Sequence, residues 1–143
     1  MREILTEVAI AAPPQRVWSI LMDFAAYGEW NPFVTAISGP PETGKQLDVT
    51  LTLPGGKEMG FTPTVTACEE DHLFQWLGKV GFKGLFDGRH SFRLTPTRRG
   101  TRFVQSEQFT GILGWLMGGK MRRRTEAGFR AMNDALKNRA ESR

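Results

Sequence analysis

The sequence of 143 residues predicts an α+β domain: an antiparallel sheet of about six to seven strands covered by a long C-terminal helix, with two short helices after the first strand. Two patterns carry this prediction. Between Phe33 and Phe109 apolar residues recur mostly at every second position, and after Gly111 they recur at the 3.6-residue spacing of a helix. No repeat, low-complexity tract or linker interrupts the chain, so we expect residues 1–143 to form a single domain.

The first 33 residues predict one strand and two short helices. Residues 4–10 alternate between apolar and polar positions, which is typical of a strand. Pro13 and Pro14 end this strand, and Pro14 suits the first turn of a helix whose apolar stripe continues to about residue 24. Residues 27–33 are rich in aromatics but broken by glycine and proline, which predicts a turn and a very short second helix.

The middle of the chain predicts the remaining strands. Alternating runs lie at residues 47–53, 59–67, 73–77, 88–94 and 101–109. The sequence Pro54-Gly55-Gly56 marks a hairpin turn after the first of these runs. Pro63 interrupts the second run, so we expect an edge position or a bulge there.

The last part of the chain predicts one long helix from about residue 114 to about residue 140. Its narrow apolar stripe consists of Met121, Thr125, Gly128 or Phe129, Met132 and Leu136. We expect Gly118 and Gly119 to kink this helix or to delay its start.

The net charge of +4 comes from the C-terminal segment, because residues 120–143 hold eight Lys and Arg against three Asp and Glu. This segment includes Arg122, Arg123 and Arg124, which we interpret as a solvated helix face. No nucleic-acid recognition motif accompanies these arginines, so no nucleic-acid partner is expected. The sequence has no apolar run of about 20 residues and no signal pattern, so we expect a cytoplasmic protein without stable membrane association.

Cysteine and histidine are too few for a metal centre or a disulfide. Cys68 is the single cysteine, and His72 and His90 are the two histidines. Structural and catalytic zinc or iron sites usually need more ligands of these kinds. We therefore expect no metal and no cofactor.

A twisted sheet under a straight helix leaves a space that large side chains must fill or line. The sequence supplies many aromatic and methionine side chains for this layer, and they suit either a closed core or a pocket for an apolar guest. Polar groups on the same inner face favour a pocket, because a pure core avoids them.

Two neighbouring strands carry such polar groups. Alternation places His90 on the face of Phe92, and it places Gln105 and Glu107 on the face of Phe103. The turn between the strands permits two registers: His90 directly opposite Glu107, or His90 opposite Gln105 with Glu107 on the diagonal. In either register the two side chains can meet, and a nearby His can compensate a buried Glu.

The predicted contact between His90 and Glu107 has three possible roles. It can be a satisfied pair that only fixes the strand register. It can be a polar anchor in an apolar cavity that recognises a hydroxyl or a carbonyl on a ligand. It can also be an acid–base pair in catalysis.

Several stretches resemble a known superfamily: APPQRVWSILMDFAAYGEWNPF, FQWLG, GLFDGRHSFRLTP and GTRFVQSEQFTG. Together with the order of elements, they are similar to the helix-grip (SRPBCC) superfamily, which includes START lipid-transfer domains, the birch-pollen allergen (Bet v 1) type and polyketide cyclases. The resemblance is strongest to bacterial ligand-binding members without an assigned activity. It implies a hydrophobic cavity between the sheet and the C-terminal helix. The polar and aromatic groups of the cyclases do not map onto this chain residue by residue.

The resemblance also implies which side chains line the cavity. They come from the short helices, the strands and the long helix: Leu21, Trp30, Phe33, Val49, Leu51, Phe61, Trp76, His90, Phe92, Phe103, Gln105, Glu107, Phe109, Met117, Met121, Phe129 and Met132. The expected ligand is a hydrophobic small molecule such as a lipid, a sterol-like compound or an aromatic polyketide-like compound. The expected protein is a monomer or a weak homodimer.

Two other functions remain open at this point. One is a cyclase-, dehydratase- or hydrolase-type enzyme that uses His90 and Glu107, which would rest on fold analogy. The other is a protein-interaction domain with a closed core, which an exposed apolar patch would favour.

Overall fold

The computed structural model describes residues 2–80, 86–111 and 118–142. The elements follow one another as β1 (Arg2–Ile10), α1 (Pro14–Met22), η1 (Phe24–Ala26), α2 (Tyr27–Trp30), β2 (Val34–Ser38), β3 (Asp48–Thr52), β4 (Glu58–Phe61), β5 (Thr64–Glu69), β6 (Leu73–Val80), β7 (Phe86–Thr97), β8 (Gly100–Thr110) and α3 (Gly119–Glu141). This is the α+β helix-grip arrangement that the sequence predicted.

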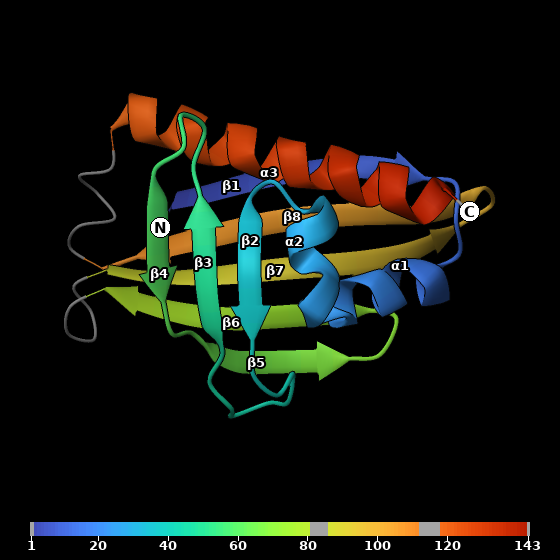
Figure 1. Ribbon diagram of the computed structural model, residues 1–143, viewed down its shortest axis with the longest axis horizontal. Helices are drawn as coiled ribbons and strands as arrows, with labels where there is room; N and C mark the ends of the chain where they lie inside the picture. The colour runs from blue at the N-terminus through green and yellow to red at the C-terminus, as the bar shows by residue number, and fades with distance from the viewer. Residues whose placement is uncertain (1, 81–85, 112–117, 143) are drawn as a thin grey trace.

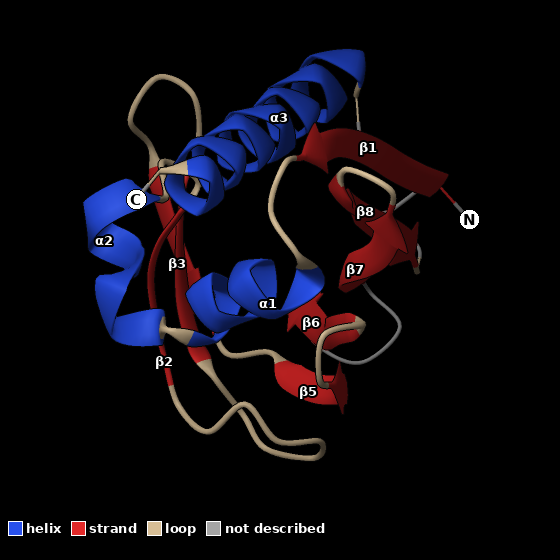
Figure 2. Cartoon of the chain, turned by 90° about the vertical axis from the view of Figure 1, so that its right-hand side faces the viewer, coloured by secondary structure: helices blue, strands red, loops and turns tan. Residues whose placement is uncertain are grey.

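The strands form two antiparallel sheets that face each other. One sheet has the order β1-β8-β7-β6-β5, and the other has the order β2-β3-β4. A bridge between Gln46 and Thr64 joins the second sheet to the β5 edge of the first. Helix α3 lies across one open side of the space between the sheets, and α1 closes one end of that space (Figures 1 and 2).

Alternation along the strands places the core where the sequence predicted it. In β1, Ile4 is fully buried, whereas its neighbour Leu5 is 52% exposed. In β8, Phe103, Gln105 and Phe109 are buried on the inner face. A one-residue slip in either strand would expose these side chains, so the apolar pattern fixes the register.

The predicted strand over residues 59–67 is wrong as a single element. It consists of β4 and β5, which belong to different sheets. Pro63 lies between them and has no N–H to offer a neighbouring strand, although its carbonyl accepts a hydrogen bond from the Leu47 backbone. The chain therefore changes sheet at Pro63. Strand β2 was not predicted as a separate element.

Helix α3 begins at Gly119 with Gly118 as its N-cap, later than the predicted start near residue 114. Residues 112–117 lie outside the described part of the chain. The buried face of the helix consists of Gly128, Phe129, Met132, Asn133, Leu136 and Ala140. The predicted stripe is thus confirmed from residue 128 onward, but Met121 is 56% exposed.

Side chains fill the middle of the space between α3 and the sheets. Phe33 meets Phe129 edge-on with ring centres 5.5 Å apart. Phe92 stacks on Phe103 with ring centres 6.1 Å apart. All four side chains are at most 1% exposed, so this part of the interior is a packed core.

Candidate functional site

His90 on β7 lies directly opposite Glu107 on β8, in the first of the two registers that the sequence allowed. The Nδ1 atom of His90 is 2.6 Å from Oε1 of Glu107. The His90 side chain is 3% exposed, whereas that of Glu107 is 19% exposed. The predicted contact therefore exists, and the Glu107 carboxylate in it is partly exposed.

The second ring nitrogen of His90 continues the polar contacts into the core. Nε2 of His90 is 2.9 Å from Oε1 of Gln105. Gln105 is fully buried, and its Nε2 donates to Oδ1 of Asn133 at 2.8 Å and to the Phe129 carbonyl at 3.3 Å. Asn133 in turn donates to Oγ1 of Thr6 at 2.8 Å. We call Glu107, His90, Gln105, Asn133 and Thr6 the polar chain.

The polar chain joins four elements, β1, β7, β8 and α3, which come from the beginning, the middle and the end of the sequence. Thr6 lies on β1, His90, Gln105 and Glu107 lie on β7 and β8, and Asn133 lies on α3. The Thr6 hydroxyl donates to the Gln105 backbone carbonyl at 3.1 Å. Every buried member of the chain therefore has partners, as buried polar groups require.

Asn133 and Thr6 are absent from the predicted site. Thr6 lies on the same face of β1 as the buried Ile4 and Ile10, so its inward direction could be predicted, but its partner could not. Asn133 follows Met132 on the helix stripe, and a polar residue inside an apolar stripe was the signal that could have indicated it.

Aromatic rings surround the imidazole of His90. Trp76 stacks on it with ring centres 5.1 Å apart, and Phe92 and Phe129 lie at 4.6 and 4.9 Å. The imidazole is thus held both by its hydrogen bonds and by packing on its faces.

Two paired glycines leave room on the inner face of the sheet beside Glu107. Gly78 on β6 pairs with Gly88 on β7. A Cβ atom at Gly88 would collide with Oε2 of Glu107, and one at Gly78 would come within 3.2 Å of the Phe61 ring. The missing side chains therefore leave the space that the Glu107 carboxylate and the Phe61 ring occupy.

The predicted lining residues as a whole fall into groups by exposure. The buried ones are Leu21, Phe33, Val49, Trp76, His90, Phe92, Phe103, Gln105, Phe109, Phe129 and Met132. Trp30, Leu51, Phe61 and Glu107 are half-buried, and Met121 is exposed on the first turn of α3. Met117 lies outside the described residues.

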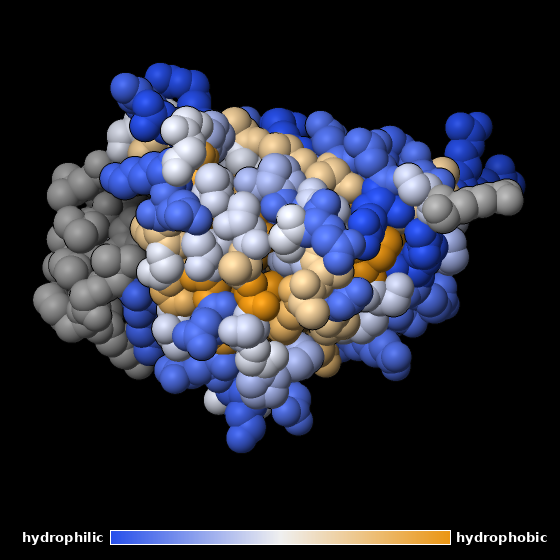
Figure 3. Space-filling view, viewed as in Figure 1, coloured by the Kyte–Doolittle hydropathy of each residue, from blue (hydrophilic) through white to orange (hydrophobic). Residues whose placement is uncertain are grey.

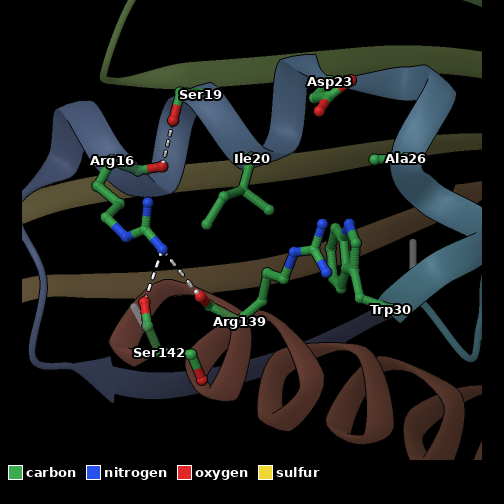
Figure 4. Close-up of a pocket in the computed structure, with 8 residues that line it drawn as sticks. All are labelled: Arg16, Ser19, Ile20, Asp23, Ala26, Trp30, Arg139 and Ser142. Carbon is green, nitrogen blue, oxygen red and sulfur yellow. Dashed lines mark hydrogen bonds between the residues drawn. The ribbon is translucent and has the colours of Figure 1, made fainter.

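A hollow of about 480 Å³ lies between α1, α2 and the end of α3 (Figure 4). Its polar groups hold the helices together. Arg16 donates to the carbonyls of Arg139, Ala140 and Ser142 at 2.8 to 3.2 Å. Arg139 donates to Glu29 on α2 at 3.1 Å. Because both arginines have protein partners, we interpret this hollow as the junction between the helices.

A second hollow, of about 470 Å³, runs along β2, β3 and β4. Apolar side chains gather over this part of the surface in the space-filling view (Figure 3). Ile37, Val49 and Phe61 contribute to it, together with polar groups such as Asp48 and Thr50.

Two titratable groups away from the polar chain have raised pKa values. Burial raises the pKa of the Tyr27 hydroxyl, with a smaller contribution from the nearby Asp23, and this hydroxyl donates to the Leu21 carbonyl at 2.7 Å. Burial also raises the pKa of the Cys68 thiol. Both groups therefore stay protonated at neutral pH.

Within residues 2–80, 86–111 and 118–142, no cluster of three His, Cys, Asp or Glu side chains could hold a metal ion. Over the same ranges, no helix is long and apolar enough to cross a membrane.

The facing sheets, the long C-terminal helix and the two short helices after β1 define the helix-grip class of proteins. The chain belongs to the family described as polyketide cyclase / dehydrase and lipid transport, whose model matches residues 1–141. A search of curated proteins finds no match.

Solved structures share the fold at low sequence identity. A structural-genomics protein from Mesorhizobium loti is 19% identical with a TM-score of 0.72, and the match covers 96% of this chain and 95% of that one. Ara h 8.0201 is 13% identical with a TM-score of 0.74, and 99% of each chain is covered. The di-domain ARO/CYC BexL from the BE-7585A biosynthetic pathway is 17% identical with a TM-score of 0.76. That match covers 99% of this chain but 50% of BexL.

Proposed function

We propose that this protein binds a hydrophobic small molecule on the inner face of the five-stranded sheet, with the polar group of the ligand at Glu107. One observation carries the proposal: a chain of buried hydrogen bonds crosses an apolar interior and ends in a partly exposed carboxylate. A closed core is not expected to contain such a group, because burying a carboxylate is unfavourable unless it is paired and hydrogen-bonded.

The position of the proposed site follows from exposure. The middle of the interior is packed, and α1 covers one end (Figure 2). Glu107 lies beside Gly88, whose strand partner Gly78 lies against the half-buried Phe61 ring. A ligand beside Glu107 would meet apolar side chains with one polar group among them, which is the usual composition of small-molecule sites.

The family description, which includes lipid transport, supports a hydrophobic ligand. The candidates remain a lipid, a sterol-like compound or an aromatic polyketide-like compound. Native mass spectrometry of protein purified from its source, followed by extraction, would identify a ligand that co-purifies. A bound ligand at a hundredfold excess over Kd stabilises a protein by about 2.7 kcal/mol, which a thermal-shift assay detects.

A matched pair of variants tests the site. In Gly78→Val the new side chain would press against the Phe61 ring, which lies 3.2 Å from the position of the added Cβ, whereas the Cβ of Gly60→Val on β4 would have no heavy atom closer than 3.9 Å. We expect Gly78→Val to lose ligand-induced stabilisation and Gly60→Val to keep it. Absence of any co-purifying ligand, together with no response to lipids, sterols and aromatic polyketides, would contradict the proposal and favour a protein-interaction domain with a closed core.

The second candidate function is an enzyme of the cyclase, dehydratase or hydrolase type. The 2.6 Å contact between His90 and Glu107, with its carboxylate partly exposed, suits proton transfer to or from a bound substrate. Once a substrate is identified, a His90→Ala variant with unchanged turnover would exclude this function.

A further inference from the structure

The directions of the hydrogen bonds in the polar chain can be assigned from the two backbone carbonyls that accept from it. Two backbone carbonyls, those of Gln105 and Phe129, take part, and a carbonyl can only accept. The Thr6 hydroxyl donates to the Gln105 carbonyl, so its oxygen accepts from the Asn133 amide. The Gln105 amide nitrogen donates to the Phe129 carbonyl and to Oδ1 of Asn133.

These directions determine the tautomer of His90. With its NH₂ group directed toward α3, Gln105 presents its oxygen, Oε1, to Nε2 of His90. An oxygen acceptor at 2.9 Å requires that Nε2 carries a hydrogen. His90 is therefore protonated on Nε2 in every state that preserves the chain.

The short contact between His90 and Glu107 then holds one proton. It lies either on Nδ1, which gives an imidazolium and a carboxylate, or on Oε1, which gives a neutral pair. A proton on Oε2 instead would leave two lone pairs facing each other at 2.6 Å, which is repulsive. In both permitted states Oε2 of Glu107 is an acceptor without a hydrogen.

His90 has no ring nitrogen left for a ligand, because Gln105 and Glu107 occupy both. Of the polar chain, Oε2 of Glu107 is the side-chain oxygen that has no hydrogen-bond partner among the described residues. Oε2 occupies the space that a side chain at Gly88 would fill, and the Glu107 carboxylate is partly exposed.

We infer that Oε2 of Glu107 recognises the ligand and that the ligand carries a hydrogen-bond donor, a hydroxyl or an N–H, on an otherwise apolar body. This inference rests on the proposed function. It makes Glu107 the specificity-determining residue, whereas His90, Gln105 and Asn133 are positioning residues. A ligand carbonyl is excluded as the group at Glu107, because two acceptors would face each other.

Four probes of one shape test the inference: 2-naphthol, 2-methoxynaphthalene, 2-acetonaphthone and naphthalene, titrated into the purified full chain by calorimetry. Hydrogen bonds to charged groups contribute about 1.5 to 3 kcal/mol, so we expect 2-naphthol to bind at least about tenfold more tightly than the other three. Equal binding of 2-naphthol and 2-methoxynaphthalene would overturn the inference and leave the proposed function standing. Failure of all four probes to bind, together with no response to lipids and sterols, would overturn both the inference and the proposed function.

Variants separate the roles within the pair. In Glu107→Gln the amide can donate to Nδ1 of His90 and leave its oxygen toward the ligand, so we expect a reduced preference for 2-naphthol. Glu107→Leu has no acceptor and should bind 2-naphthol and 2-methoxynaphthalene equally. Gln108→Leu on the outward face of β8 is the control and should keep the full preference. A preference retained in Glu107→Leu would contradict the inference.

Two further measurements do not depend on the stability of Glu107→Leu. Gly88→Ala places a methyl group where Oε2 lies, so it should weaken 2-naphthol binding about tenfold or more. NMR of the His90 ring nitrogens in the wild-type protein should show Nε2 protonated with and without 2-naphthol. An Nε2 that loses its hydrogen when 2-naphthol binds would overturn the assignment.

Discussion

Gly128 on α3 lies against the ring of Phe33, so closely that a Cβ atom would be 2.5 Å from Cδ1 of that ring. This is nearer than any two such atoms can approach without displacement. The helix therefore reaches its position over the core because residue 128 has no side chain. Phe33 also packs on Phe129, so one ring meets two successive helix residues.

Gly128→Ala should lower the free energy of unfolding. Replacing glycine by alanine inside a helix gains about 1 kcal/mol, but overpacking a buried ring costs about 1 to 3 kcal/mol. We expect the second effect to dominate, and urea unfolding measures it. In a Phe33→Leu background the ring is absent, so the same substitution should stabilise the protein. Destabilisation of equal size in both backgrounds would show that the ring is not the cause.

Asn133→Ala should destabilise the protein more than most single substitutions in α3. It leaves the Gln105 amide without one of its acceptors and the Thr6 hydroxyl without its donor. Each buried unsatisfied group costs about 1 to 3 kcal/mol. Asn138→Ala, on the exposed side of the same helix, is the control and should change stability by less than about 0.5 kcal/mol. Similar values for the two variants would contradict a structural role for the polar chain.

Arg16→Met should loosen the end of α3. The Arg16 guanidinium donates to three carbonyls in the last turn of the helix and the residue after it. Figure 4 draws two of these hydrogen bonds, those to Arg139 and Ser142. Without it, amide hydrogen exchange over residues 138–142 should become faster. Arg16→Lys should not restore protection, because one ammonium group cannot replace the several planar N–H donors of the Arg16 guanidinium. Arg139→Met removes only the exposed pair with Glu29, and we expect a smaller change.

Glu141 links stability to pH. A hydrogen bond from the Ala11 backbone, and then the Lys137 ammonium, hold the pKa of the Glu141 carboxyl below its usual value. A lowered pKa means that the carboxylate stabilises the fold above the pKa of the unfolded chain, and that this contribution is lost as pH falls through the folded pKa. Glu141→Gln should therefore have a lower Tm than wild type at pH 7, and the difference should disappear in strong acid. Thermal unfolding from pH 2 to pH 7 checks this, with Glu70→Gln as an exposed control. A difference that persists in acid would show that charge is not responsible.

The contact between His90 and Glu107 could be predicted because it depends only on strand parity and on the short turn between the two strands. Each strand has two faces, and apolar neighbours select one of them. The same reasoning could not reach Asn133, because its contact with Gln105 depends on how far α3 is shifted along the sheet. That shift is set by packing at positions such as Gly128, which no local pattern encodes.

The role of Pro63 shows the same limit in the sheets. Alternation on both sides of it looked like one interrupted strand, since the apolar residues keep their spacing. The assignment to two sheets depends on the pairing of residues 44–47 with residues 63–65, which connects distant parts of the chain. Local periodicity can predict where strands occur, but it does not identify their partners.

Strand β1 has consequences for how the chain folds during synthesis. Its partner strand is β8, and its Thr6 hydrogen-bonds to a helix residue 127 positions away. While the ribosome still holds the last third of the chain, β1 has neither a strand to pair with nor a helix to cover it. The apolar residues of β1 therefore stay exposed until β8 and α3 have been synthesised. Because these contacts join residues far apart in sequence, we expect the last step of folding to be slow. A nascent chain that stalls before residue 133 would present Ile4, Val8 and Ile10 to chaperones.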